Sequence, residues 1–134
     1  MFTLHRQLAA DTVEVARLDV SWVLLSRDAN YPWFILVPAI DGAREFHHLD
    51  AGVQQKILLE SAQLASAIER IYRPDKLNIA ALGNVVPQLH IHHIARFATD
   101  AAWPAPVWGK LPPKHFAGEE LAVAARAMAT ELKS

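Results

Sequence analysis

The sequence has no cysteine among its 134 residues, and this absence removes several kinds of chemistry. Disulfide bridges, thiolate nucleophiles and cysteine-ligated zinc sites are all excluded. Long apolar runs are also absent, because the longest, Trp33 to Ile40, is interrupted by Pro38 and is too short to span a bilayer. No basic segment followed by an apolar one opens the chain, as a secretory signal would. These absences predict a cytoplasmic protein without a membrane partner.

An excess of charge of one sign is missing as well. The chain has 13 Lys and Arg against 14 Asp and Glu, which gives a formal net charge of -1. Such a balance creates no strong overall field for nucleic acid or an anionic membrane, so neither is an expected partner. Hydrophobic residues make up 52% of the chain, enough for a sizeable core. We expect one domain over residues 1–134.

What the chain does contain is an alternation of β-rich and helical segments, which predicts an α+β fold. Four stretches have the composition and boundaries of strands, the first two forming a hairpin around the turn formers of residues 28–32. A main helix is expected from its N-cap Asp50 to the residues before Pro74, and a second over about 117–133. We predict an antiparallel meander of about five strands, covered by the main helix, with a C-terminal helix. The four predicted strands are Ser21–Arg27, Trp33–Ile40, Lys76–Gly83 and Gln88–Arg96.

The last of these strands, "QLHIHHIAR", carries three histidines within four residues. Side chains alternate along a strand, so His90 and His92 share one face while His93 lies on the other. Two residue rises separate the pair by about 6.6 Å, which lets both rings reach one phosphate or one metal ion. Neutral imidazole is a nucleophile and imidazolium an acid, so two such rings are able to divide these roles.

From this spacing alone, three interpretations stay open for the pair. The rings are structural or solvated, as single histidines usually are; they act on a phosphate; or they bind a metal. A metal site would take its remaining ligands from His47, His48 or Glu45. His93 has a simpler interpretation as a structural residue that is hydrogen-bonded beneath the covering helix.

The stretch "QLHIHHIAR" also resembles the signature of the histidine triad (HIT) superfamily, His-φ-His-φ-His-φ-φ with φ apolar. In that register Gln88 takes the first histidine position, His90 the second and His92 the third, and Arg96 follows His92 by four residues. The resemblance extends to "VLLSRDANYPWFILVPAIDG" and "DKLNIAALGN" upstream, and to "DAAWPAPVWG", which is similar to a bacterial subgroup. It covers residues from about 20 to 109.

This resemblance implies a nucleotide-binding hydrolase or nucleotidyl transferase that acts at the α-phosphate of a nucleoside phosphate derivative. Dinucleoside polyphosphates and phosphoramidates are typical substrates of the family. His90 would be the nucleophile that forms a nucleotidyl-histidine, and His92 would bond the phosphate or the leaving-group oxygen. No cofactor or catalytic metal is implied, and members commonly form homodimers.

The resemblance also implies a set of residues that contact the substrate. The main-chain carbonyl of Gln88 would accept a hydrogen bond from the ring of His90 and fix its tautomer. Asn78 resembles the family asparagine that contacts phosphate, and Asp28 lies near the position that bonds the ribose. Asn84 and Arg96, on either side of the motif, complete this predicted set.

Two departures from the family pattern leave alternatives open. Gln88 is unable to carry a proton at neutral pH, so any relay through the first position is lost. Trp33 occupies about the place where the nucleoside phosphoramidase branch has a further histidine. The alternatives are a nucleotide-binding module with weak catalysis and a metal-binding protein that uses the His-x-His strand.

Overall fold

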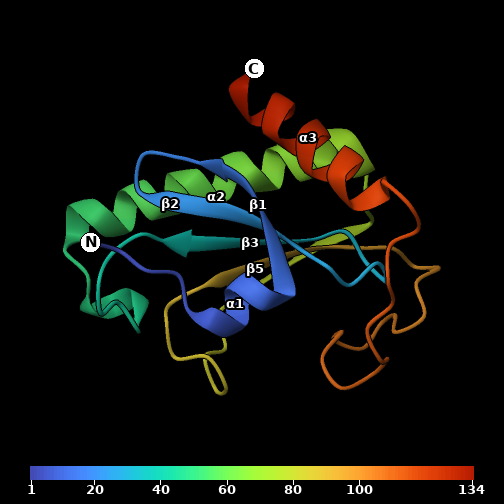
Figure 1. Cartoon of the computed structure of the whole chain (residues 1–134), viewed down its shortest axis with the longest axis horizontal. Helices are drawn as coiled ribbons and strands as arrows, with labels where there is room; N and C mark the ends of the chain where they lie inside the picture. Colours follow the sequence, from blue (N-terminus) through green and yellow to red (C-terminus); the bar gives the residue numbers. More distant parts are fainter.

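The computed structural model describes residues 1–134 and is built on a five-stranded antiparallel sheet. The predicted hairpin is present, with Ser21 paired to Pro38 and Leu25 to Phe34. Across the sheet the strands follow the order β1 (Thr12–Arg17), β2 (Ser21–Ser26), β3 (Trp33–Pro38), β5 (Ile91–Arg96) and β4 (Lys76–Ala80). The α+β prediction is therefore confirmed, with the strands shown in Figure 1.

The prediction of a simple meander is wrong, because β5 lies between β3 and β4. The chain leaves β3, runs through the main helix and returns at the far edge as β4, so the last strand fills the middle. There β5 pairs with β3 on one side and β4 on the other. A central position suits β5, since its residues from His92 to Arg96 are all buried.

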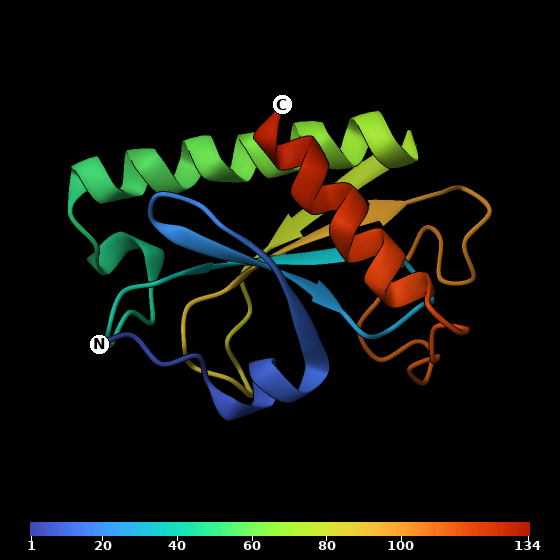
Figure 2. The same cartoon turned by 45° about the horizontal axis from the view of Figure 1, so that its top comes forward.

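The helices α2 (Ala51–Tyr72) and α3 (Glu120–Lys133) lie together on one side of the sheet (Figure 2). Asp50 is the N-cap of α2 as predicted, and the helix ends at Arg73, which has φ 50° and is followed by Pro74. The principal core fills the space between these helices and the sheet. Its fully buried members include Val23, Phe34, Leu36, Leu64, Ile68 and Met128.

The opposite face of the sheet is covered by irregular chain and one short helix. The helix α1 (Arg6–Asp11) and the loops of residues 81–90 and 97–119 lie over it, around a smaller apolar cluster that includes Leu8, Ile35 and Val86. Neither α1 nor β1 is predicted from the sequence. A helix of six residues is too short to show a helical period, and the alternation of β1 is short because a bulge interrupts it between Glu14 and Ala16. No helix of the chain has the length and apolarity needed to cross a membrane.

Candidate functional site

The two histidines predicted to share a face lie together on the side of the sheet opposite α2. His92 is in β5, while His90 immediately precedes the strand, which is shorter than the predicted Gln88–Arg96. Their ring centroids are 4.9 Å apart, closer than strand geometry alone requires, and each residue is 7% exposed. His93 lies on the other face and is completely buried. The structure thus brings His90 and His92 together as the alternation predicts.

The tautomer of His90 is fixed by the backbone. Its Nδ1 lies 2.7 Å from the carbonyl oxygen of Gln88. A carbonyl oxygen only accepts, so Nδ1 must carry the proton and donate it. The lone pair of the neutral ring is then on Nε2, the nitrogen a nucleophile needs free.

The tautomer of His92 is fixed in the opposite sense by a side chain. The indole Nε1–H of Trp33 donates to Nδ1 of His92 over 2.9 Å. Indole is a donor only, so Nδ1 must be unprotonated and the ring proton lies on Nε2. Burial lowers the pKa of His92 to about 4, with smaller contributions from the neighbouring His90 and His93 rings. His92 is therefore a neutral donor over most of the pH range.

His92 borders two cavities. The larger, of about 340 Å³, runs from His92 along Trp33 and Ile35 to the β2–β3 turn and the residues that join α1 to β1. The smaller, of about 170 Å³, is lined by both catalytic candidates, by Trp108 and by the 82–86 loop that includes Asn84. Gly83 in that loop has φ 77°, a conformation that favours glycine. The predicted residue Asn84 is thus placed beside both histidines.

Asp28 lies in the β2–β3 turn and lines the larger cavity. Its Oδ1 accepts hydrogen bonds from the backbone N–H of Asn30 and of Lys114, at 3.0 and 3.2 Å. The side-chain amide of Asn30 also donates to Oδ1, and no protein group donates to Oδ2. The position is compatible with the predicted contact to a ribose hydroxyl, and it also ties the turn to the loop that precedes α3.

Gln88 contributes its main chain to the site but directs its side chain elsewhere. The side-chain Oε1 accepts from the N–H of His5 over 2.8 Å, and Nε2 donates to the carbonyl of Thr3 over 2.9 Å. The residue in the first histidine position therefore pins the N-terminal segment against the site. It also lines a third cavity together with His90.

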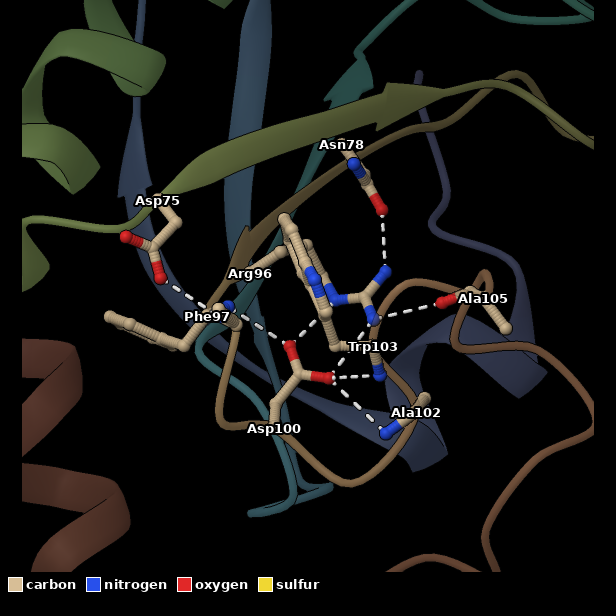
Figure 3. A network of polar contacts seen from close by, with 9 residues as sticks. Asp75, Asn78, Arg96, Phe97, Asp100, Ala102, Trp103 and Ala105 are labelled. Carbon is tan, nitrogen blue, oxygen red and sulfur yellow. Dashed lines mark hydrogen bonds and ion pairs between the residues drawn. The ribbon is translucent and has the colours of Figure 1, made fainter.

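Arg96 and Asn78 belong to a buried network further along the same face of the sheet (Figure 3). The guanidinium of Arg96 makes two bonds to the carboxylate of Asp100, at 2.9 and 3.0 Å, and also donates to Asn78 Oδ1 and to the carbonyl of Ala105. Arg96 is 1% exposed, and neither it nor Asn78 lines a cavity that His92 borders. This placement favours a role for Arg96 in orienting Asn78 over the predicted direct contact with substrate.

Asp100 lies at the centre of that network and is not predicted from the sequence. Its carboxylate also accepts from the backbone N–H groups of Phe97, Ala102 and Trp103, which shapes the loop after β5. The hydrogen bond from Arg96 is the main cause that lowers the pKa of Asp100 to about 2. Its spacing of four residues from Arg96 was the signal available in the sequence.

His93 has the structural role that the sequence predicts. Its Nδ1 lies 3.0 Å from the carbonyl oxygen of Ile91, and its Nε2 lies 2.7 Å from Oγ of Ser61 in α2. Burial lowers its pKa to about 4. Both ring nitrogens are therefore satisfied beneath the covering helix.

No third ligand for a metal ion lies close to His90 and His92, although the His-x-His pattern allows a metal site. No group of three or more His, Asp or Glu side chains converges closely enough to hold a metal ion. His47 and His48 lie in a short 3₁₀ helix, Phe46–His48, where their rings meet edge to face with centroids 4.4 Å apart.

Trp33 and Trp108 are the site residues whose roles the sequence did not reveal. Their rings lie 5.6 and 5.1 Å from that of His92, both edge-on, and 5.9 Å from each other. Only Trp33 bonds to the histidine. A tryptophan at the start of a strand usually signals burial, so nothing in the sequence pointed to its N–H as a functional group.

A family model described as the HIT domain matches residues 7–99. The chain belongs to the HIT domain family. The match includes the histidine segment, β1 to β5 and nearly all of α1. No curated protein matches the chain.

Solved structures of HIT proteins are similar to the chain over nearly its whole length. A histidine triad protein from Bradyrhizobium japonicum is 44% identical, with a TM-score of 0.95 and 98% of each chain covered. One from Marinobacter aquaeolei is 46% identical, with a TM-score of 0.92, covering 98% of this chain and 96% of the other. A hypothetical histidine triad nucleotide-binding protein from Sulfolobus tokodaii is 14% identical, with a TM-score of 0.69 and coverages of 91% and 84%, and shows the shared HIT fold alone.

Proposed function

We propose that this HIT protein is a nucleotide-binding hydrolase or nucleotidyl transferase that acts at the α-phosphate of a nucleoside phosphate derivative. Nε2 of His90 attacks phosphorus, the bond to the leaving group breaks, and a nucleotidyl-histidine forms. Water or another acceptor then attacks phosphorus, the P–N bond breaks, and its electron pair returns to Nε2. With water as the acceptor, one proton is released to solvent.

The observation that carries this proposal is the hydrogen bond between Nδ1 of His90 and the carbonyl of Gln88. It keeps Nε2 unprotonated without a titrating partner, and after the attack the same carbonyl stabilises the Nδ1–H of the positively charged ring. His92, 4.9 Å away, supplies an Nε2–H donor for an oxygen that gains charge in the transition state.

The cavities support a placement of the substrate. The phosphate would lie in the smaller cavity, between His90 and the 82–86 loop with Asn84. The nucleoside would extend along Trp33 and Ile35 into the larger one, with its ribose near Asp28. A mostly apolar surface that ends in a few polar groups is typical of such pockets.

The experiment is intact-mass spectrometry of wild-type protein and His90→Ala after brief exposure to adenosine and guanosine phosphate derivatives, with chelator present. Anhydrides and phosphoramidates are both included, and products are analysed in parallel. We expect an acid-labile nucleotidyl adduct, turnover, or both in wild type and neither in His90→Ala. His93→Gln is the matched control and retains both. Turnover by His90→Ala would overturn the proposal.

A second candidate is a nucleotide-binding module with little turnover. It is favoured by the engagement of the Gln88 side chain with Thr3 and His5, which leaves no proton relay at the first position. Nucleotide binding by wild type and His90→Ala, with neither adduct nor product, would select this candidate.

The protein's assembly belongs to the same proposal: one domain over residues 1–134, cytoplasmic and paired as a homodimer. The edge strand β4 and the loop after it expose Ile79, Leu82 and Val85 by 49%, 47% and 88%. Such residues at an open sheet edge are suited to burial against a second copy. Light scattering after size-exclusion chromatography should give twice the chain mass for wild type and the single mass for Ile79→Lys. A wild-type monomer would contradict the pairing.

A further inference from the structure

The hydrogen bond between Trp33 and His92 limits what His92 is able to do. The indole N–H has no lone pair to offer, so it bonds to His92 only while Nδ1 is unprotonated. Formation of the imidazolium would break this bond and place two N–H groups against each other. Trp33 therefore favours the neutral ring in one tautomer, with the proton on Nε2.

The surroundings of His92 act in the same direction. The residue is 7% exposed, and its ring is enclosed by those of His90, Trp33 and Trp108. No carboxylate lies within salt-bridge distance of the His92 ring, so no negative charge there favours the imidazolium form. The titratable and charged groups that face it across the cavities or the strand are Asp11 of α1, Arg27 and Asp28 of the β2–β3 turn, Lys114 and His115 before α3, and His90 and His93 of its own segment.

We propose that Trp33 is a positioning residue that holds His92 as a neutral Nε2–H donor, and that the site consequently selects phosphoric anhydrides over phosphoramidates. The inference rests on the proposed function and names the substrate class of that same site.

The tautomer of His92 affects the choice of substrate because leaving groups differ in their need for a proton. When Nε2 of His90 attacks an anhydride, the P–O bond breaks and its electron pair leaves on a phosphate oxygen, which is stable without a proton. A hydrogen bond from the neutral His92 is sufficient for that oxygen. When a P–N bond breaks, the nitrogen has to leave as a neutral amine, so it needs a proton during the step. An imidazolium is a competent acid for this purpose, whereas a neutral imidazole is a very weak one.

The burial of His92 supports the preference for anhydrides over phosphoramidates, because it lowers the pKa of the ring to about 4. Near neutral pH, only a small fraction of the free enzyme would carry the acid that a phosphoramidate requires.

The experiment compares Trp33→Phe with Trp108→Phe. Both variants keep an aromatic ring near His92, but only the first removes a hydrogen bond to it. ¹⁵N NMR of the imidazole groups, recorded between pH 4 and 8, reports the tautomer and the titration of His92. In parallel, kcat/KM is measured for an adenosine 5′-phosphate anhydride and an adenosine 5′-phosphoramidate.

In wild type and Trp108→Phe we expect the single Nε2–H tautomer and a preference for the anhydride. In Trp33→Phe we expect mixed tautomers, titration at higher pH, and an anhydride-to-phosphoramidate ratio of kcat/KM that falls about fivefold, the equivalent of one ordinary hydrogen bond. The change should grow as the pH is lowered, since more His92 is then protonated.

Three results would overturn the inference. The first is a wild-type spectrum with His92 protonated on Nδ1, a result that needs no variant and no turnover. The second is a substrate ratio that stays the same in Trp33→Phe, and the third is a wild-type enzyme that prefers the phosphoramidate. Turnover of neither substrate would instead refute the proposed function and the substrate class with it, while the spectrum would still decide the role of Trp33.

Discussion

The two faces of β5 each bear a buried histidine, but the two side chains have different surroundings. Neighbouring residues His92 and His93 are both buried histidines, and burial lowers the pKa of each to about 4. One faces cavities and a tryptophan, and the other is sealed beneath α2 by Ser61. Neither residue type nor pKa therefore identifies a reactive histidine. What distinguishes the two is whether a ring nitrogen is left for a substrate.

The partners of the rings make this difference explicit. His93 uses both nitrogens, one with the carbonyl of Ile91 and one with Ser61. His90 and His92 each use only Nδ1 within the protein, and they use it in opposite senses. The face of β5 that borders the cavities therefore presents a free lone pair on His90 and a free N–H on His92. The centroids of the two rings are 4.9 Å apart.

The largest effect we predict on either face is on stability, at Arg96. Replacing Arg96 by Met should lower the free energy of unfolding by about 3–5 kcal/mol, because it leaves the carboxylate of Asp100 buried without its partner. Lys56→Met is the control, since its ion pair with Asp19 is exposed and should contribute less than about 1 kcal/mol. Urea denaturation measures both, and equal losses in the two variants would show that the network is dispensable.

The next prediction separates the two histidines by activity. His92→Leu should lower kcat/KM by about 10²–10³, the loss typical of removing one donor to a developing charge, because leucine has no N–H group. His93→Gln, one residue away, should change it by less than about threefold. Steady-state kinetics on any turned-over nucleotide tests the pair. Similar losses in both variants would mean that the face of the sheet does not decide function.

The next prediction concerns the low pKa that His92 and His93 share, which should make the free energy of unfolding depend on pH. Each has a folded-state pKa of about 4 against an ordinary value of 6.5, so the unfolded chain binds protons first as the pH falls. Stability is therefore complete above about pH 6.5 and is lost towards pH 4, by about 3 kcal/mol for each ring. In His93→Gln the loss over this interval should be smaller by about that amount. Urea denaturation at a series of pH values measures it, and an unchanged pH dependence would contradict the buried neutral ring.

The features of the site that could be predicted from the sequence are those that depend on residues close together in the chain. Alternation along a strand is local, so the shared face of His90 and His92 and the opposite placement of His93 were predicted correctly. The order of the strands was not, because the insertion of β5 beside β3 depends on pairing across more than fifty residues. The bond from Trp33 to His92 spans 59 positions and leaves no periodic trace.

The resemblance to a family supplied what periodicity could not, with one limit. It implied the carbonyl of Gln88 as the partner of His90, and the structure has that bond at 2.7 Å. It also implied that Arg96 contacts substrate, whereas the guanidinium is buried and engaged with Asp100 and Asn78. A motif transfers residue positions, but the direction of a long side chain depends on the local loop, here the one after β5.

The smallest effect that we predict concerns the face of β5 that is covered by α2. Ser61→Ala removes one hydrogen bond to Nε2 of His93 and should cost about 1 kcal/mol in the free energy of unfolding. The nitrogen left behind is buried and unpaired, so the pKa of His93 should stay low and kcat/KM should not change. Thermal unfolding together with NMR titration of the His93 ring measures both. If the variant instead allowed His93 to titrate near 6.5, solvent would be reaching the ring, and the contrast between the two faces of β5 would be one of packing density and not of hydrogen-bond partners.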